Sequence, residues 1–215
     1  MAVAATRQRI LRAARQMVKR GSDVPIDELA RHAGVSVQTI YAHFGSKRGL
    51  VLAAIDDMQR EIGFYADLET VFASPHGEAA LRRMIAVTFG LWDRGWPLVA
   101  FTLRARRLDR DIGAQLAEVD TMRRSHLWMI CRRLEAEGRL RTPGAVEPAT
   151  DLAFALSTPT VYEDLVQVRG WPSEHAAGTI AGIIVDTVVD PATEPVTEPP
   201  PDWSALGAGT RMTAR

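Results

Sequence analysis

The sequence is nearly free of cysteine, has no apolar run long enough to cross a membrane and carries no net charge. Its one cysteine, Cys131, cannot form a disulfide within the chain, which excludes a disulfide-stabilised fold and favours a reducing compartment. The longest apolar stretch near the end, 180–189, contains Asp186 and is too short for a bilayer. The first residues, MAVAATRQR, lack the apolar core of a signal peptide. We therefore expect a cytoplasmic protein without a membrane partner.

The zero net charge hides two regions of opposite sign. The chain of 215 residues contains 26 Lys and Arg against 26 Asp and Glu. Residues 1–50 hold 9 basic and 3 acidic side chains, a net charge of +6, and the remaining 17 basic and 23 acidic residues give −6. A basic segment joined to an acidic remainder is typical of a nucleic-acid contact module fused to a second domain.

Alternation typical of strands is almost absent, whereas apolar residues recur at helical spacing along most of the chain. Glycines or serines stand at several of the expected helix boundaries, such as Gly34, Ser36, Gly45 and Ser46. The sequence therefore predicts an all-α protein with helices at about 6–20, 26–33, 37–44, 47–72, 78–94, 97–107, 110–138, 148–169 and 173–190.

The expected helices fall into two domains and a tail. Residues 1–50 predict a three-helix DNA-binding domain with a helix-turn-helix, and the helix at 47–72 connects it to the rest. Residues 51–190 predict a larger helical domain for ligand binding and dimerisation. Residues 191–215 contain five prolines and few apolar residues, so we expect this tail to be disordered.

The expected helix at 37–44 divides by face. Val37, Ile40 and Phe44 recur at i, i+3 and i+7 and should pack against the two preceding helices. The opposite face carries small and amide side chains, with Tyr41 at its edge: Gln38, Thr39, Ala42 and His43. Such a face fits a major groove, where glutamine can pair with adenine and apolar atoms can contact the thymine methyl group.

Two segments resemble the tetracycline-repressor (TetR) family of transcriptional regulators. They are IDELA at 26–30 and, above all, GVSVQTIYAHFGSK at 34–47, and the resemblance covers about residues 6–60. It implies that Val37, Gln38 and Tyr41 face base edges or thymine methyl groups. It also implies that the phosphate backbone is held by a second, overlapping set: Thr6, Arg7, Ser36, Thr39, Tyr41, His43 and Lys47. The family usually has Ser or Thr at the start of its second helix, and Pro25 stands there in this chain, so that hydroxyl contact is lost.

The segment YEDLVQVRGWP at 162–172 and the apolar helix after it resemble the last two helices of the same family, which form a four-helix dimer interface. The apolar stripes of this region are broader than one core requires, which indicates an interface. Its expected residues are Leu152, Leu156, Leu165, Ile180, Ile184 and Val188. The alternative is that these side chains are buried within one chain.

Aromatic and polar residues in the larger domain are candidates for a pocket that binds a lipophilic effector. They are Thr88, Trp92, Trp96, Phe101, Ser125, His126, Trp128 and Phe154. The alternative is that each aromatic residue is part of the core, since aromatic stripes at helical spacing more often serve packing.

The resemblance implies a ligand-responsive regulator, a repressor in the commoner mode of the family. As a homodimer it would place two recognition helices in successive major grooves of a palindromic operator, and a small molecule would release it. Two other classes stay open: an enzyme built on a helical bundle, and an architectural DNA-binding protein without an effector. The sequence has no paired Glu-x-x-His, no Gly-x-Ser-x-Gly and no zinc-ligand spacing. We therefore expect no catalytic residues, no cofactor and no metal.

Overall fold

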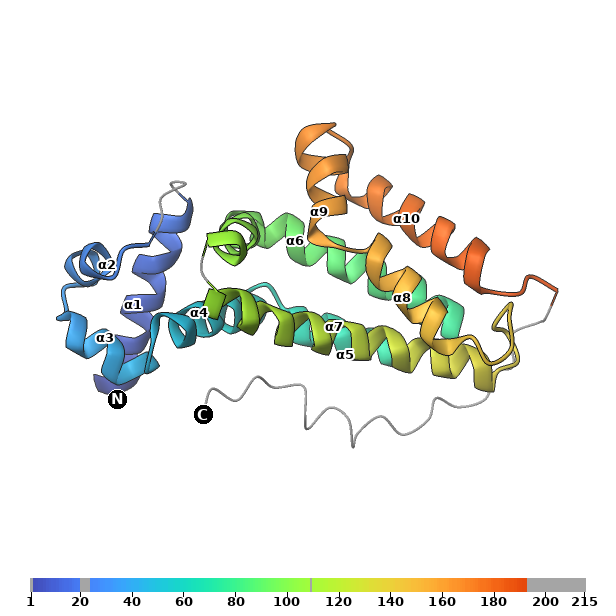
Figure 1. The fold of residues 1–215 in the computed structure, drawn as a ribbon, viewed down its shortest axis with the longest axis horizontal. Coiled ribbons are helices and arrows are strands. Elements are labelled where there is room, and N and C mark those ends of the chain that lie inside the picture. Colours follow the sequence, from blue (N-terminus) through green and yellow to red (C-terminus); the bar gives the residue numbers. More distant parts are fainter. Residues whose placement is uncertain (1, 20–23, 109, 193–215) are drawn as a thin grey trace. The chain divides into compact units, whose positions relative to one another are not determined.

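A computed structural model of the chain describes residues 2–19, 24–108 and 110–192 (Figure 1). In these ranges the regular elements are helices, and there is one isolated antiparallel β-bridge, between Leu140 and Val189. The helices are α1 (Ala2–Lys19), α2 (Ile26–Ala33), α3 (Val37–Phe44), α4 (Lys47–Glu61), α5 (Phe64–Phe72), α6 (Gly77–Leu108), α7 (Arg110–Ala136), α8 (Val146–Leu156), α9 (Pro159–Tyr162), the π-helix η1 (Glu163–Val168) and α10 (Ser173–Val188). The all-α prediction is confirmed. The expected disorder of the tail concerns residues that lie almost entirely outside the described ones.

The described residues form two compact units. The first contains the chain up to Ile62 together with Gly95–Glu118, and the second contains Gly63–Arg94 and the described residues from Val119 onward. The predicted boundary at residue 50 falls inside α4, and the division into a DNA-binding and a regulatory domain stays a prediction.

In the first unit, α1, α2 and α3 share an apolar core. Ile10, Leu11, Leu29 and Ile40 are fully buried there. Each of the two short helices, α2 and α3, has only eight residues, which is too few for an isolated helix to persist in water. Their stability therefore depends on this shared packing.

The junction between α3 and α4 requires a glycine. Gly45 follows α3 with a φ of 72°, which L side chains rarely adopt. In the first turn of α4, a Cβ added to Gly49 would overlap the carbonyl oxygen of Phe44 at the end of α3. The two helix ends can approach this closely only because residue 49 has no side chain.

Three predicted helix boundaries are wrong. The helix expected at 47–72 is interrupted at Ile62 and Gly63, where Gly63 adopts a φ of 76°. The two helices expected at 78–94 and 97–107 are one helix, α6, which continues through Pro97. A proline inside a helix removes one backbone hydrogen bond and can be accommodated by a kink, so it does not have to end the helix. The helix expected at 148–169 is broken at Ser157, after which the Thr158 hydroxyl accepts a bond from the Val161 N–H at 3.3 Å and begins α9.

An aromatic cluster lies in the core of the second unit. The ring centroids of Phe89 and Trp92 on α6 lie 5.6 and 5.8 Å from that of Tyr162 on α9. Tyr162 is fully buried, and its hydroxyl donates a hydrogen bond of 2.8 Å to the Asp93 carboxylate. Burial, and then this bond to Asp93, raise the pKa of Tyr162 to about 12.

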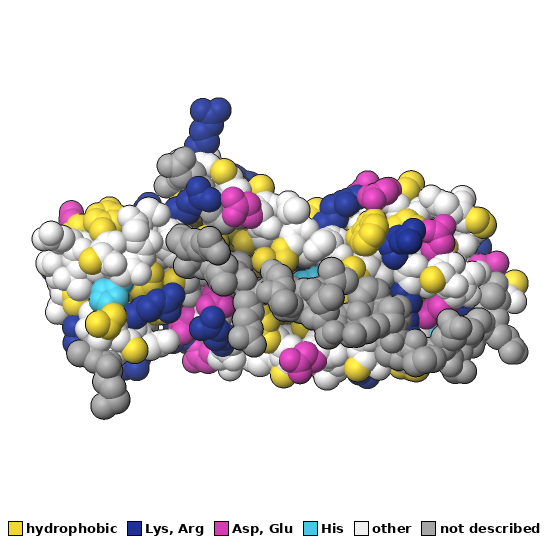
Figure 2. Space-filling model, turned by 90° about the horizontal axis from the view of Figure 1, so that it is seen from below, with side chains coloured by type: hydrophobic (Ala, Val, Ile, Leu, Met, Phe, Trp, Pro, Cys, Tyr) yellow, Lys and Arg dark blue, Asp and Glu magenta, His cyan; other side chains and the backbone are white. Residues whose placement is uncertain are grey.

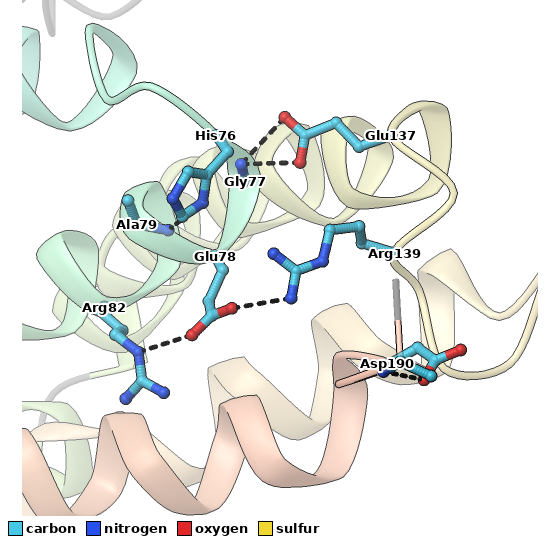
Figure 3. A network of polar contacts seen from close by, with 9 residues as sticks. His76, Gly77, Glu78, Ala79, Arg82, Glu137, Arg139 and Asp190 are labelled. Atoms are coloured by element: carbon cyan, nitrogen blue, oxygen red, sulfur yellow. Dashed lines mark hydrogen bonds and ion pairs between the residues drawn. The ribbon is translucent and has the colours of Figure 1, made fainter. Parts of the chain in front are cut away.

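A polar network joins the start of α6 to the end of α7 (Figure 3). Arg133 is buried and donates to Glu137 at 2.8 Å and to the carbonyls of Ser74 and Pro75 at 2.9 and 2.8 Å. Glu137 in turn accepts from the Gly77 N–H through both oxygens, at 3.0 and 2.9 Å. The guanidinium of Arg133 therefore holds the loop before α6 against α7.

None of the helices in the described ranges is both long and apolar enough to cross a membrane.

Candidate nucleic-acid interface

The turn between α2 and α3 is set by a glycine and a serine. Gly34 ends α2 in the left-handed conformation, with φ 62° and ψ 41°. The Val35 N–H then donates to the Ala30 carbonyl at 3.0 Å. Ser36 caps α3, since its hydroxyl accepts from the Thr39 N–H at 3.0 Å. These local bonds fix the direction in which α3 leaves the turn.

The face of α3 predicted to contact bases is accessible. Ile40 is fully buried, and Val37 and Phe44 are half-buried. Gln38 is exposed, and Tyr41 is 42% exposed. The structure thus leaves one side of α3 open over its whole length, as the predicted base contacts require.

The hydroxyls predicted to hold phosphates are partly engaged within the protein. Ser36 and Thr39 share a hydrogen bond of 2.8 Å between their hydroxyls, in addition to the cap. Each hydroxyl oxygen has two lone pairs and one proton, so capacity for a phosphate contact remains. His43 is half-buried, and its ring centroid lies 6.2 Å from that of Phe44.

Two cationic side chains flank α3. The Arg7 guanidinium on α1 lies 5.3 Å from the centroid of the Phe44 ring, which places the start of α1 beside the end of α3. Thr6 precedes it and is half-buried. Lys47 is exposed at the first position of α4, where Ser46 caps the Gly49 N–H at 3.0 Å. Figure 2 shows Lys and Arg side chains beside a histidine over these N-terminal helices.

The start of α2 differs from the family pattern as the sequence indicated. Pro25 stands at its N-cap position and makes no side-chain cap bond. Asp27 and Glu28 occupy the first turn of this helix. Negative charge at this helix end would repel a phosphate there.

The predicted pocket residues do not come together as one set. Trp96 and Phe101 belong to the first unit, whereas Thr88, Trp92 and His126 are buried in the second. Phe154 is half-buried beneath the Arg123 guanidinium, 3.9 Å from its ring centroid.

Two of the predicted pocket residues are exposed in the structure. Ser125 is exposed, and its hydroxyl donates to the Met122 carbonyl at 2.7 Å. Trp128 is 37% exposed, and its indole N–H donates to Glu147 at 2.9 Å. Both side chains therefore lie at the surface of α7, and their contact with an effector stays a prediction.

The side chain of His126 in the second unit is buried and has one ring nitrogen without a hydrogen-bond partner among the described residues. His126 is 5% exposed, and this nitrogen is Nε2. Its ring contacts Phe72 edge to face, with 5.8 Å between centroids. Burial lowers the pKa of His126 to about 4, so the ring is neutral at pH 7.

Half of the residues predicted for the dimer interface are buried within the chain. Ile180, Ile184 and Val188 on α10 are 6%, 0% and 5% exposed, and their contact with a second copy stays a prediction. Leu152, Leu156 and Leu165 are half-buried and stay a prediction. Ile183, on another side of α10, is 47% exposed instead.

Sequence reasoning missed an open groove between α6 and α10. Small residues line both walls at a spacing of four, with Ala86 and Gly90 on α6 and Ala177 and Ala181 on α10. This i, i+4 repeat of small residues was the available signal, since it marks a helix stripe that lacks side-chain bulk.

The N-terminal part of the chain matches a known family. Residues 10–54 match bacterial regulatory proteins of the tetR family. Over 90 residues the chain is 34% identical to the HTH-type transcriptional regulator EthR of Mycolicibacterium smegmatis. This match covers 41% of the chain and 38% of that relative, so the chain aligns with less than half of the relative's length.

Two solved structures show the same fold over most of the chain. The transcriptional regulator FadR from Bacillus subtilis, in complex with stearoyl-CoA, is 18% identical with a TM-score of 0.65, covering 84% of this chain and 98% of its own. SmeT, in a complex with triclosan, is 20% identical with a TM-score of 0.66, covering 92% of this chain and 100% of its own.

Proposed function

Since residues 10–54 place the chain in the tetR family of bacterial regulatory proteins, we propose that the chain is a ligand-responsive repressor. It binds a palindromic operator as a homodimer. The observation that carries the proposal is the open face of α3, which presents Gln38 and Tyr41 to solvent between two flanking cations, Arg7 and Lys47. A helix with an amide, hydroxyls and little bulk fits a major groove. Flanking cations fit the phosphates on either side of it.

The residues divide into readers and anchors. Val37, Gln38 and Tyr41 contact base edges. Thr6, Arg7, Ser36, Thr39, His43 and Lys47 hold phosphates, and Tyr41 adds a phosphate contact through its hydroxyl. The anchors supply affinity for any duplex, whereas the readers discriminate among sequences.

A homodimer is supported by apolar surface near the end of the chain. Val168 on η1 is 69% exposed, and Ile183 on α10 is 47% exposed. Together with the half-buried Leu152, Leu156 and Leu165, these two residues give the chain an apolar surface on which a second copy can pack. Two copies then hold two recognition helices about 34 Å apart, one turn of DNA.

A lipophilic effector is supported by two of the solved structures with this fold. One was solved with stearoyl-CoA and the other with triclosan. In this chain, the second unit offers a buried polar atom for such a molecule, the unpartnered Nε2 of His126, beside the Phe72 ring. Binding would release DNA by favouring a state in which the two recognition helices no longer fit successive grooves.

Selection of duplexes from a random pool tests the DNA-binding role. The purified chain should enrich a palindrome whose half-sites lie about one helical turn apart, and the affinity should fall steeply with salt. A variant in which Gln38 and Tyr41 are both replaced by Ala is the matched control, since it keeps Arg7 and Lys47. It should retain non-specific binding and lose the palindrome.

Sedimentation of the same preparation measures the dimer, and titration of the enriched duplex with lipophilic compounds measures release. Enrichment without sequence preference, with no compound that releases DNA, would indicate an architectural protein instead. Failure to retain any duplex at low salt contradicts the proposal outright.

A further inference from the structure

The groove between α6 and α10 is an open cavity of about 530 Å³ within the second unit. The α6 wall consists of Arg82, Ala86, Phe89, Gly90, Asp93 and Arg94. The α10 wall consists of Ser173, Glu174, Ala177, Gly178 and Ala181. From Arg82 to Asp93 the α6 wall runs about 16 Å, at 1.5 Å per residue. Its middle is formed by small apolar residues and its two ends by charged ones.

The groove is open because two glycines stand where side chains would fill it. A Cβ added to Gly178 would meet no atom within 4 Å. A Cβ added to Gly90 would meet only the Arg94 guanidinium, at 3.9 Å. The space at Gly178 is therefore open and the space at Gly90 is bordered by Arg94, and a larger residue can be placed at Gly178 without a clash.

One end of the groove carries excess negative charge. Asp93 and Glu174 have no ion pair with any described residue, whereas Arg94 at the same end is paired with Asp67 at 3.0 Å. The Tyr162 hydroxyl donates to Asp93. Because burial raises the pKa of Tyr162 to about 12, this donor stays neutral and does not offset the charge of Asp93. Two formal negative charges remain at this end.

The other end of the groove is positive. Arg82 donates to Glu78 at 3.0 Å, and the second oxygen of Glu78 accepts from the buried Arg139 at 3.1 Å (Figure 3). One carboxylate is thus shared by two guanidiniums, which leaves one positive charge. Nε and Nη1 of Arg139 have no hydrogen-bond partner among the described residues, so no second carboxylate offsets it.

We propose that this groove binds an organic cation with a single ammonium group and an apolar body. The ammonium lies between Asp93 and Glu174, and the apolar body lies along Ala86, Gly90 and Gly178. A carboxylate ligand is repelled at the acidic end. A diamine that spans the groove brings its second ammonium toward Arg82, so the groove selects monocations. Charge complementarity of this kind gives specificity more than affinity.

The site is distinct from the surface proposed for dimerisation. Gly178 and Ile183 are five residues apart on α10, so at 100° per residue the two positions face directions about 140° apart. A second copy seated on Ile183 therefore leaves the Gly178 side of the helix free. The site does not depend on DNA binding either, since its lining residues belong to the second unit and the recognition helix to the first.

Calorimetric titration of the full chain with three probes of equal chain length tests the proposal. The probes are octylammonium, octanoate and 1,8-diaminooctane. We expect octylammonium to bind saturably with a stoichiometry of one per chain. We expect octanoate to give no saturable binding and the diamine to bind at least fivefold more weakly than octylammonium. Equal binding of octylammonium and octanoate would overturn the proposal, because it would show an apolar contact without charge selection.

Three variants locate the site. The first is the double variant Asp93→Asn, Glu174→Gln, which keeps the size of both side chains and, at residue 93, an acceptor for Tyr162. It should weaken octylammonium binding about tenfold, since exposed charge pairs contribute factors of about two to five each. Gly178→Leu should abolish binding by filling the groove. Asp186→Asn removes a carboxylate from an exposed position of the same helix and should change nothing.

Each result separates this site from the proposed regulator. Dimerisation, measured by sedimentation, and operator retention should be the same for Gly178→Leu and the natural chain. If Gly178→Leu keeps the affinity for octylammonium, the groove is not the binding site, whatever the DNA experiments show. If Asp186→Asn weakens binding as much as the pair at 93 and 174, the acidic end is not responsible.

Discussion

The boundaries of α2 and α3 are set by contacts between close neighbours in the sequence, whereas in the second unit the start of α6 is joined to the end of α7 by contacts between distant residues. Ser36 caps the N–H of Thr39, three positions away. Arg133 bonds to the carbonyls of Ser74 and Pro75, 59 and 58 positions away. The difference explains why the bounds of α3 could be predicted from sequence alone. It also indicates that the two regions respond differently to substitution.

The largest effect should follow from removing the buried guanidinium. Arg133→Met leaves the buried Glu137 side chain without its ion pair and removes the donors to the carbonyls of the buried Ser74 and of Pro75. We expect the free energy of unfolding to fall by about 3–5 kcal/mol. Urea denaturation measures it, and Arg132→Met is the matched control, because Arg132 is exposed on the same helix and should cost less than about 1 kcal/mol. Equal losses for the two variants would show that the long-range network adds no stability.

A pH titration of stability tests the second unit through His126. The unfolded ring has a pKa near 6.5, and burial holds the folded one at about 4. Above pH 6.5 the ring is neutral in both states, and as the pH falls from 6.5 to 4 only the unfolded chain gains the proton. The natural chain should therefore lose about 3 kcal/mol more over this range than His126→Leu does. His175→Leu, at an exposed ring, should follow the natural chain.

In the first unit the effects should appear in recognition. Gln38→Ala should reduce discrimination at one base pair of each half-site by about 1–3 kcal/mol, because the amide can no longer form a bidentate pair. Repeating the duplex selection with this variant measures the change, and thermal unfolding should be unaltered because Gln38 is exposed. If the variant selects the same sequence as the natural chain, Gln38 does not contribute to base recognition.

The local cap can be tested by Ser36→Ala. Loss of the bond to the Thr39 N–H should lower the free energy of unfolding by about 1 kcal/mol. Ser36→Asp, which keeps an acceptor at the cap, should restore most of that stability while it weakens DNA binding through repulsion of phosphate. If Ser36→Ala unfolds with the same midpoint as the natural chain, the cap does not stabilise α3.

The smallest effect belongs to a single phosphate contact. Lys47→Ala should weaken binding to all duplexes alike and reduce the slope of log affinity against log salt by about 1. Measurements at several salt concentrations, on the selected operator and on an unrelated duplex, check both statements. A loss confined to the operator would assign Lys47 to base recognition instead.

Short-range signals made α2 and α3 predictable to the residue, whereas the end of α4 and the continuity of α6 were missed. The bounds of α2 and α3 agree with the sequence because Gly34, Ser36 and Gly45 act within one turn of themselves. The open face of α3 followed from the same periodicity, with Ile40 inward and Gln38 outward. The roles assigned to these side chains on DNA stay predictions.

The second unit was predicted less well, for a physical reason. Periodicity shows that Ile184 and Val188 are apolar, but not whether a helix of the same chain or a second copy covers them. Trp128 is aromatic and at core-like spacing, yet its indole N–H lies on the surface at Glu147. The break at Ser157, like the continuation through Pro97 in the first unit, depends on tertiary packing, which outweighs local preference.

Gly49 has a consequence for how a signal could reach DNA. Because nothing but a hydrogen atom separates this residue from the Phe44 carbonyl, the end of α3 and the first turn of α4 abut backbone to backbone. No compressible side chain lies between them that could absorb a displacement. We therefore expect a rotation of α4 to be transmitted to α3 directly through this backbone contact.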